Sequence, residues 1–368
     1  MTSNQPIQRQ GGITLMKRKS LFRTFTFIVL ASIIAIVAGC GSKASPANSS
    51  AAGSAPAAAS AADSKKYEGV VVNIEGSQIG PILIAKEKGW FEEEFAKYGA
   101  TVKYQSLQSA SQFLEAIASD RLDFARTGYI GTITGQAANI GFTSISEGSN
   151  GGGDGIIVPK DSPVQSVKDL KGKKIAVSKG SSSWGLLLNA LKKDGLKLAD
   201  IQAINLQPDE AQSAFQSGKV DAWVVWEPFR TNQIKNQGAK LLAEGKTIGA
   251  FNPAYNIVRT KFAKQYPELV GAYLKAYERA LQWQNKNLDE AVTLLAKSKK
   301  LDEETIRISL TNNVATNLPI SAEANKSQQA TADLMLESGD LKEKLDVTKV
   351  IDNSYIEKAL KEYPTEKR

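Results

Sequence analysis

Short apolar runs alternate with amphipathic segments along most of the chain, which predicts alternating strands and helices. β-branched residues fill the short runs, as in buried strands, and the longer segments repeat apolar residues at helical spacing. In a first unit, we expect strands at 69–74, 101–104, 123–125, 142–146 and 154–159, and helices at 82–98, 111–119 and 131–138.

A second unit repeats this rhythm. Its expected strands are 174–177, 202–205, 222–225 and 238–242, and its helices are 182–193 and 209–216. The strand expected at 254–259 leads the chain back to the first unit. Beyond Phe262 only helices are expected, at 266–286, 288–296, 303–311, 322–338 and 356–363.

Strands that alternate with helices predict an α/β fold with parallel sheets covered on both faces. Two such units joined by two crossings predict a body of two lobes with a cleft between them. Lobe 1 is expected to comprise residues 67–157 and 254–368, and lobe 2 residues 158–253, with the hinge near 158–159 and 254–257. Ligands of such sheets bind outside the carboxyl ends of the strands, where loops enter helices.

The opening segment is typical of a secretory signal. Lys17-Arg18-Lys19 supplies a positive region, residues 24–38 an apolar run, and Ala38-Gly39-Cys40 small residues before the chain's only cysteine. Cys40 resembles the lipid-acylated cysteine of bacterial lipoproteins, which implies attachment to the extracytoplasmic face of the cell membrane. The alternative, a transmembrane anchor, is disfavoured because the apolar run is shorter than the ~20 residues that a spanning helix needs.

The signal is expected to cover residues 1–40, with Met16 as a second candidate start. Residues 41–66 are mostly Ala, Ser, Gly and Pro, which predicts a flexible linker. The formal charge of +8 includes five basic residues and no acid in residues 1–40, so the rest carries 41 basic against 38 acidic residues. This near balance argues against a nucleic-acid binder.

The chain contains no histidine, and no cysteine remains after Cys40. These absences exclude disulfides within the exported part, Cys- or His-based zinc sites and the nucleophile–histidine pairs of many hydrolases. We therefore predict no catalytic residues, no metal and no cofactor. A secreted enzyme that uses paired carboxylates is the remaining catalytic alternative.

The clearest candidate binding loop lies between the strand at 174–177 and the helix at 182–193. It holds Gly180, Ser181, Ser182, Ser183 and Trp184. A helix N-terminus favours an anion, Gly180 permits close approach of the backbone, and the hydroxyls add donors. One serine that merely caps the helix is the alternative, and the absence of a Walker A pattern argues against a nucleotide.

Two further segments follow strands. In Trp223-Val224-Val225-Trp226-Glu227-Pro228, the Trp226 indole can cover an apolar substituent and Glu227 can meet a donor or a cation; the alternative is that both indoles are core. The segment that holds Ser77, Gln78 and Gly80 follows the first strand and offers neutral donors. Taken alone, this last segment is indistinguishable from an ordinary turn.

Several of these runs resemble the solute-binding proteins of ABC importers for aliphatic sulfonates, a family that includes taurine- and nitrate-type binders. The matching stretches are 85–92, 122–128, 156–163, 169–176, 179–182 and 220–229. The resemblance extends over about residues 69–283. It implies a type II periplasmic-binding-protein fold, a small organosulfonate ligand, no catalysis, and delivery of the ligand to a membrane permease.

The chain departs from the family pattern at two places. Glu227 stands where the family has Asp before the proline, and Thr127 is followed by Gly128 and Tyr129 where the family has Thr-Gly and an acid. Gly128 and Tyr129 belong to a loop expected to line the cleft. These changes leave open nitrate, a sulfate ester, or a thiamine-pyrimidine precursor stacked on Trp184 and Trp226. We also expect a monomer.

Overall fold

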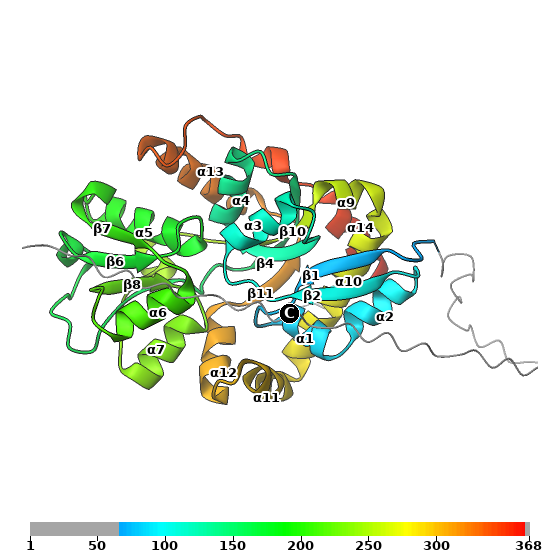
Figure 1. The fold of residues 1–368 in the computed structure, drawn as a ribbon, viewed down its shortest axis with the longest axis horizontal. Helices are drawn as coiled ribbons and strands as arrows, with labels where there is room; N and C mark the ends of the chain where they lie inside the picture. Colours follow the sequence, from blue (N-terminus) through cyan, green and yellow to red (C-terminus); the bar gives the residue numbers. More distant parts are fainter. Residues whose placement is uncertain (1–65, 365–368) are drawn as a thin grey trace, which may run out of the picture. The chain divides into compact units, whose positions relative to one another are not determined.

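The computed structural model describes residues 66–364, which form two β-sheets and the helices that cover them (Figure 1). The predicted signal and all of the predicted linker except Lys66 lie outside the described residues. None of the helices between residues 66 and 364 is long and apolar enough to cross a membrane.

The first sheet has six strands in the order β11-β4-β10-β3-β1-β2. Apolar residues such as Val72, Ile74 and Phe124 are fully buried within it, as expected for a sheet covered on both faces. The strands are β1 (Val71–Glu75), β2 (Thr101–Gln105), β3 (Phe124–Gly128), β4 (Phe142–Ser149), β10 (Ala254–Arg259) and β11 (Ala315–Leu318).

The second sheet has five strands in the order β7-β6-β8-β5-β9. Its central strands are almost entirely apolar, and every residue of β5 and β8 is buried. The strands are β5 (Gly155–Val158), β6 (Lys174–Val177), β7 (Gln202–Asn205), β8 (Ala222–Val225) and β9 (Lys240–Glu244).

Helices follow most strands, as the sequence predicts. Those that follow strands of the first sheet are α1 (Pro81–Glu87), α2 (Trp90–Ala96), α3 (Ala110–Ala118), α4 (Tyr129–Ala137), α9 (Thr260–Gln265) and α10 (Pro267–Lys286). Those of the second sheet are α5 (Ser182–Lys193), α6 (Pro208–Gln216), α7 (Phe229–Gln237) and α8 (Gly245–Ile248). The C-terminal helices are α11 (Leu288–Lys299), α12 (Glu303–Asn312), α13 (Ala322–Glu337) and α14 (Ser354–Glu362).

Two local expectations were wrong. The helix expected at 82–98 is two helices, because Gly89 adopts a left-handed conformation (φ 71°) that ends the first and starts the second. The segment after Phe262 is not wholly helical, since β11 pairs with β4 at the edge of the first sheet. Nothing local in the four residues of β11 distinguishes them from a loop.

The expectation of purely parallel sheets was also wrong. β10 runs antiparallel to β3 and β4, and β5 runs antiparallel to β8 and β9. Both are strands at which the chain enters a sheet from the other one. Two neighbouring strands become parallel when a helical crossover connects them within one sheet. A strand that enters from the other sheet has no such connection, so it can pair antiparallel.

The crossings between the sheets also lie elsewhere than predicted. β5 belongs to the second sheet, so residues 155–157 do not belong with the first sheet and the first crossing comprises residues 150–154. The second crossing lies between β9 and β10, within residues 245–253. The backbones of the two crossings are in close contact: a Cβ on Gly151 would lie 1.9 Å from the Asn252 carbonyl oxygen. Only glycine fits there. A Cβ on Gly152 would likewise lie 2.2 Å from the Asn312 carbonyl oxygen at the end of α12, so two of the three glycines are required by close backbone approach.

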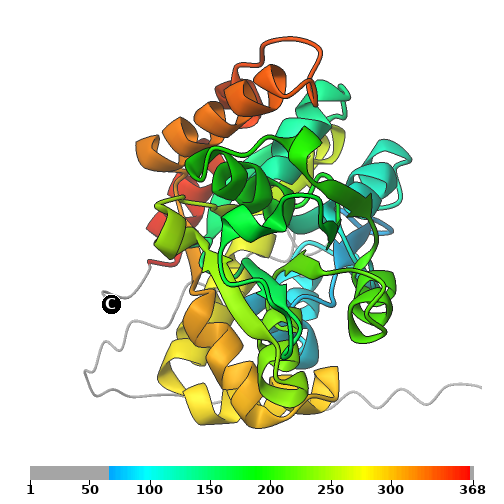
Figure 2. The same ribbon diagram turned by 90° about the vertical axis from the view of Figure 1, so that its left-hand side faces the viewer.

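C-terminal helices contact elements of both sheets. α12 packs on α7 of the second sheet, and α13 packs on α4 and α5. In Figure 1, α11 and α12 lie beneath the sheets and α13 above them; Figure 2 shows the same arrangement from the side of the second sheet. In addition to the two crossings, α13 therefore joins the two halves of the protein by packing on helices of both sheets, and α12 packs on a helix of the second sheet.

Candidate functional site

A cavity of about 330 Å³ lies where loops from the two sheets face each other. It is bordered by residues that follow β1 and β2 and by the end of β3 in the first sheet, and by residues that follow β6 and β8 in the second, together with the first crossing and the end of α11. This is the position that the strand order predicts for a ligand.

The cavity contains about half of the residues that the sequence nominates. The predicted residues that line it are Ser77, Gln78, Gly128, Ser181, Ser182, Trp226 and Glu227. Those that do not are Gly80, Tyr129, Gly180, Ser183 and Trp184. Gly80 and Gly180 still shape the loops, since both have positive φ (103° and 82°).

Trp184 is a structural residue. Its side chain is 2% exposed, and its indole Nε1 donates to Asp340 Oδ2 at 3.2 Å. Trp184 is the third residue of α5. Ser181 and Ser182, at the start of this helix, line the cavity, whereas Trp184 does not. The expectation that Trp184 stacks on a ligand is therefore wrong, whereas Trp226 lines the cavity and packs edge-on against Phe229.

The serine hydroxyls of the α5 loop donate within the protein. Ser181 Oγ donates to the Ser178 carbonyl oxygen at 2.6 Å, and Ser182 and Ser183 donate to Asp154 Oδ1 at 2.9 and 2.5 Å. The hydroxyls are thus not the free donors that the sequence suggests. The Ser181 and Trp184 N–H groups donate to the Ser178 and Ser181 carbonyl oxygens at 3.2 and 3.0 Å. Within residues 66–364, the N–H groups of Ser182 and Ser183 have no backbone acceptor, and they remain the anion-favouring feature of this loop.

The N-terminus of α4 meets that of α5. A Cβ on Gly128, the residue before α4, would lie 2.6 Å from Ser182 Cβ. Tyr129 is fully buried, and its hydroxyl donates to Asn252 Oδ1 at 2.9 Å, so it holds α4 against the second crossing. The Tyr129 N–H donates to the Pro253 carbonyl oxygen at 3.0 Å, so of these two helix N-termini only that of α5 offers backbone donors to the cavity.

Gly128→Ala is expected to disturb this contact. The φ of Gly128 is −67°, which alanine tolerates, so the cost comes from the clash with Ser182 and not from backbone strain. We expect the free energy of unfolding to fall by about 1–3 kcal/mol, as for other overpacked sites, measured by urea titration. Gly141→Ala is the control, because a Cβ there meets nothing within 4 Å; equal effects of the two changes would contradict the close contact.

Arg126 is the cationic group that sequence reasoning missed. It lies in β3 and lines the cavity. Its Nε donates to Gln78 Oε1 at 3.0 Å, while Gln78 Nε2 donates to the Arg126 carbonyl oxygen at 2.7 Å. Within residues 66–364, no carboxylate forms an ion pair with it. The available signal was an arginine near the carboxyl end of a strand, where ligands of such sheets bind.

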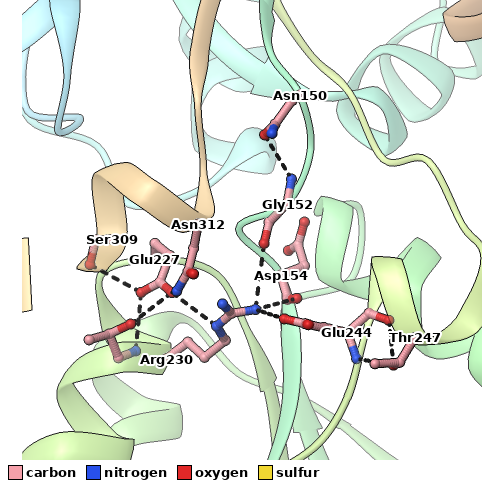
Figure 3. Close-up of polar contacts among 10 residues, drawn as sticks. Asn150, Gly152, Asp154, Glu227, Arg230, Glu244, Thr247, Ser309 and Asn312 are labelled. Carbon is pink, nitrogen blue, oxygen red and sulfur yellow. Dashed lines mark hydrogen bonds and ion pairs between the residues drawn. The ribbon is translucent and has the colours of Figure 1, made fainter. Parts of the chain in front are cut away.

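Glu227 has a structural role instead of the expected ligand-reading one. Its carboxylate is buried and accepts bonds from Arg230 Nε (2.9 Å), the Thr231 N–H and hydroxyl (3.1 and 2.8 Å), Ser309 Oγ (3.1 Å) and Asn312 Nδ2 (2.8 Å) (Figure 3). Both oxygens are therefore occupied by the protein. The network connects the loop after β8 to α12.

A second cation lies at the end of α11. Lys299 lines the cavity, and its Nζ donates to the Ser77 carbonyl oxygen at 3.0 Å; burial lowers the pKa of this ammonium. Close by, Gln108 Nε2 donates to Asp209 Oδ2 at 2.6 Å, which joins a loop after β2 to α6 of the second sheet. The Ser77 hydroxyl donates to the buried Glu75.

Asp154 closes the hinge end of the cavity. The residue is 4% exposed, and burial raises the pKa of its carboxyl to about 6, against the lowering effect of the Ser183 and Ser182 hydroxyls. Its contribution to folding stability falls as the pH rises from about 4 to about 6, because the folded state binds the proton more tightly than the unfolded one does. No group of His, Cys, Asp and Glu side chains within residues 66–364 is arranged to hold a metal ion.

Comparison with known proteins places the chain in a family. Residues 76–291 match the family described as NMT1/THI5 like. The chain belongs to the NMT1/THI5-like family. Within the NMT1/THI5-like family, it is 41% identical over 337 residues to a protein assigned as an aliphatic sulfonates-binding protein of Bacillus subtilis, a match that covers 91% of this chain and 97% of the relative.

Two further relatives agree. The chain is 31% identical over 282 residues to a protein assigned as an aliphatic sulfonates-binding protein of Escherichia coli, covering 76% of this chain and 87% of the relative. The alkanesulfonate-binding protein SsuA of Xanthomonas axonopodis pv. citri, solved bound to MOPS, superposes with a TM-score of 0.72 at 27% identity, covering 77% of this chain and 97% of that one. The predicted two-lobe periplasmic-binding-protein fold and the family resemblance are confirmed.

Proposed function

We propose that the protein binds a small organosulfonate in the cavity between its two sheets and delivers it to the permease of an ABC importer. The observation that carries this proposal is Arg126, a cavity-lining guanidinium that no carboxylate between residues 66 and 364 neutralises. The names of the relatives, which denote sulfonate-binding proteins, support the same ligand class.

In this proposal the sulfonate oxygens accept hydrogen bonds from Arg126 and from the backbone N–H groups at the start of α5. A sulfonate carries one negative charge over three oxygens, so several donors can share it, and Arg126 supplies a fork of donors. The Trp226 indole covers the apolar part of the ligand. Binding without chemistry fits the absence of histidine and the full occupation of the Glu227 carboxylate by protein donors.

A thermal-shift screen tests the ligand class. A ligand that binds only the native state raises the melting temperature, because it adds a stabilisation that grows with the logarithm of 1 + [L]/Kd. We expect alkanesulfonates to raise it, and nitrate, a sulfate ester and an aminopyrimidine to have smaller effects. A shift caused by the aminopyrimidine alone would favour the alternative ligand that the family fold leaves open.

We further propose that the mature protein is a monomer that begins at Cys40 and is held by a lipid on the extracytoplasmic face of the membrane. The charged, apolar and small-residue order of residues 17–40 supports this. Cys40→Ala is expected to abolish lipid labelling and to release the protein into the soluble fraction or block its processing. Membrane fractionation and normal maturation of this variant would contradict the anchor; Ser42→Ala is the matched control.

A further inference from the structure

We propose that Asp154 selects sulfonates that carry an ammonium group, by pairing its free carboxylate oxygen with that cation. This inference rests on the proposed function, because it assigns a second contact to the same ligand. It transfers to Asp154 the role that the sequence suggests for Glu227.

The first argument is the bonding of the carboxylate. Asp154 Oδ1 accepts both the Ser182 and the Ser183 hydroxyl, which fixes the orientation of the side chain. Oδ2 receives no hydrogen bond from any residue between 66 and 364, and it is not among the side-chain oxygens of that stretch that are sealed from solvent without a partner, so it is open to the cavity that Asp154 lines. A ligand cation can therefore reach Oδ2, and a hydrogen bond between two charged groups in this enclosed position would add affinity.

The second argument is the charge around Asp154. Arg230 Nη1 donates to the Asp154 backbone carbonyl at 3.0 Å, but the same guanidinium pairs with Glu227 and Glu244 (Figure 3). Tyr129 is the other titratable group nearby, and burial raises its pKa beyond the physiological range. No cation is therefore dedicated to the Asp154 carboxylate.

The third argument is the separation of charge within the cavity. Arg126 comes from β3 of the first sheet, whereas Asp154 lies in the first crossing and is bonded to α5 of the second sheet. A ligand with a sulfonate at one end and an ammonium at the other would place opposite charges against these two residues. A plain alkanesulfonate would leave Asp154 Oδ2 unpaired.

The test compares 2-aminoethanesulfonate with propane-1-sulfonate, in which a methyl group replaces the ammonium. At about pH 7.5, where Asp154 is ionised, the wild-type protein is expected to bind the aminosulfonate about 10- to 100-fold more tightly, as for one hydrogen bond between charged groups. Asp154→Asn should remove this preference. Asp209→Asn should keep it; Asp209 also borders the cavity, but its carboxylate accepts a hydrogen bond from the exposed Gln108 side chain.

A second measurement needs only the wild-type protein. Near pH 6 Asp154 is partly protonated. Binding of 2-aminoethanesulfonate should release protons, because its ammonium stabilises the ionised carboxylate. Binding of propane-1-sulfonate should take up protons, because it brings a negative charge without a cation. Calorimetry in two buffers with different ionisation enthalpies measures both. Opposite signs support the proposal.

Three outcomes would overturn it. Equal affinities for the two ligands in the wild-type protein, with the same sign of proton exchange, would show that Asp154 does not read a cation, while leaving sulfonate binding intact. Loss of the preference in Asp209→Asn but not in Asp154→Asn would assign the cation to Asp209. Binding of neither sulfonate would overturn this inference together with the proposed function.

Discussion

Replacing Arg230 with glutamine is expected to lower the free energy of unfolding by about 3–5 kcal/mol, the range for removing one partner of a buried ion pair. The Arg230 side chain is 3% exposed and the Glu227 side chain 0%. Without the guanidinium, Glu227 keeps four neutral donors but loses its countercharge. The carbonyl oxygen of Asp154 and the Glu244 carboxylate lose a donor as well.

Urea titration measures this effect, and Arg307→Gln is the matched control. Arg307 pairs with Asp289 at 2.6 Å on the surface, with side chains 42% and 89% exposed. Such pairs contribute about 0–1 kcal/mol. If Arg230→Gln costs no more than Arg307→Gln, the buried network does not hold the loop after β8 to the crossings.

Replacing Arg126 with glutamine is expected to weaken sulfonate binding by about 10- to 100-fold, which corresponds to about 1.5–3 kcal/mol for hydrogen bonds to a charged group. The amide keeps a donor but loses the charge that the cavity offers to the anion. Folding should be affected less, because Arg126 is only half-buried and its side chain bonds to the neutral Gln78.

Two control variants separate charge from geometry in this experiment. Arg126→Lys keeps the charge but not the planar fork, so it should recover part of the affinity. Arg121→Gln removes an arginine whose side chain is 61% exposed and should leave the Kd unchanged. An Arg126→Gln protein that binds sulfonates as the wild type does would remove Arg126 from the site.

Local pattern predicted most of the fold. β6, α5, β7, β8 and β10 begin and end at the predicted residues, because each is a compact apolar run or an amphipathic segment bounded by Gly or polar residues. The errors concern pairing between distant segments. Strand direction in β5 and β10, and the strand character of β11, depend on partners that no local window contains.

The sequence predicted which chain segments border the cavity more successfully than it predicted the roles of individual side chains. The loops after β1, β6 and β8 and the end of β3 all border the cavity, since the carboxyl ends of neighbouring strands meet there. The sequence does not show which acidic side chain of the cavity keeps a carboxylate oxygen without a hydrogen bond from the protein. Glu227 is occupied by Arg230, Ser309 and Asn312, two of which come from a distant helix, whereas Asp154 lies in a glycine-rich run without any motif.

The most direct test of the central claim is a calorimetric titration of the wild-type protein with 2-aminoethanesulfonate and propane-1-sulfonate, beside nitrate at the same ionic strength. The account predicts saturable one-to-one binding of at least one sulfonate and weaker or no binding of nitrate. Saturable binding of nitrate with no heat from either sulfonate would contradict it.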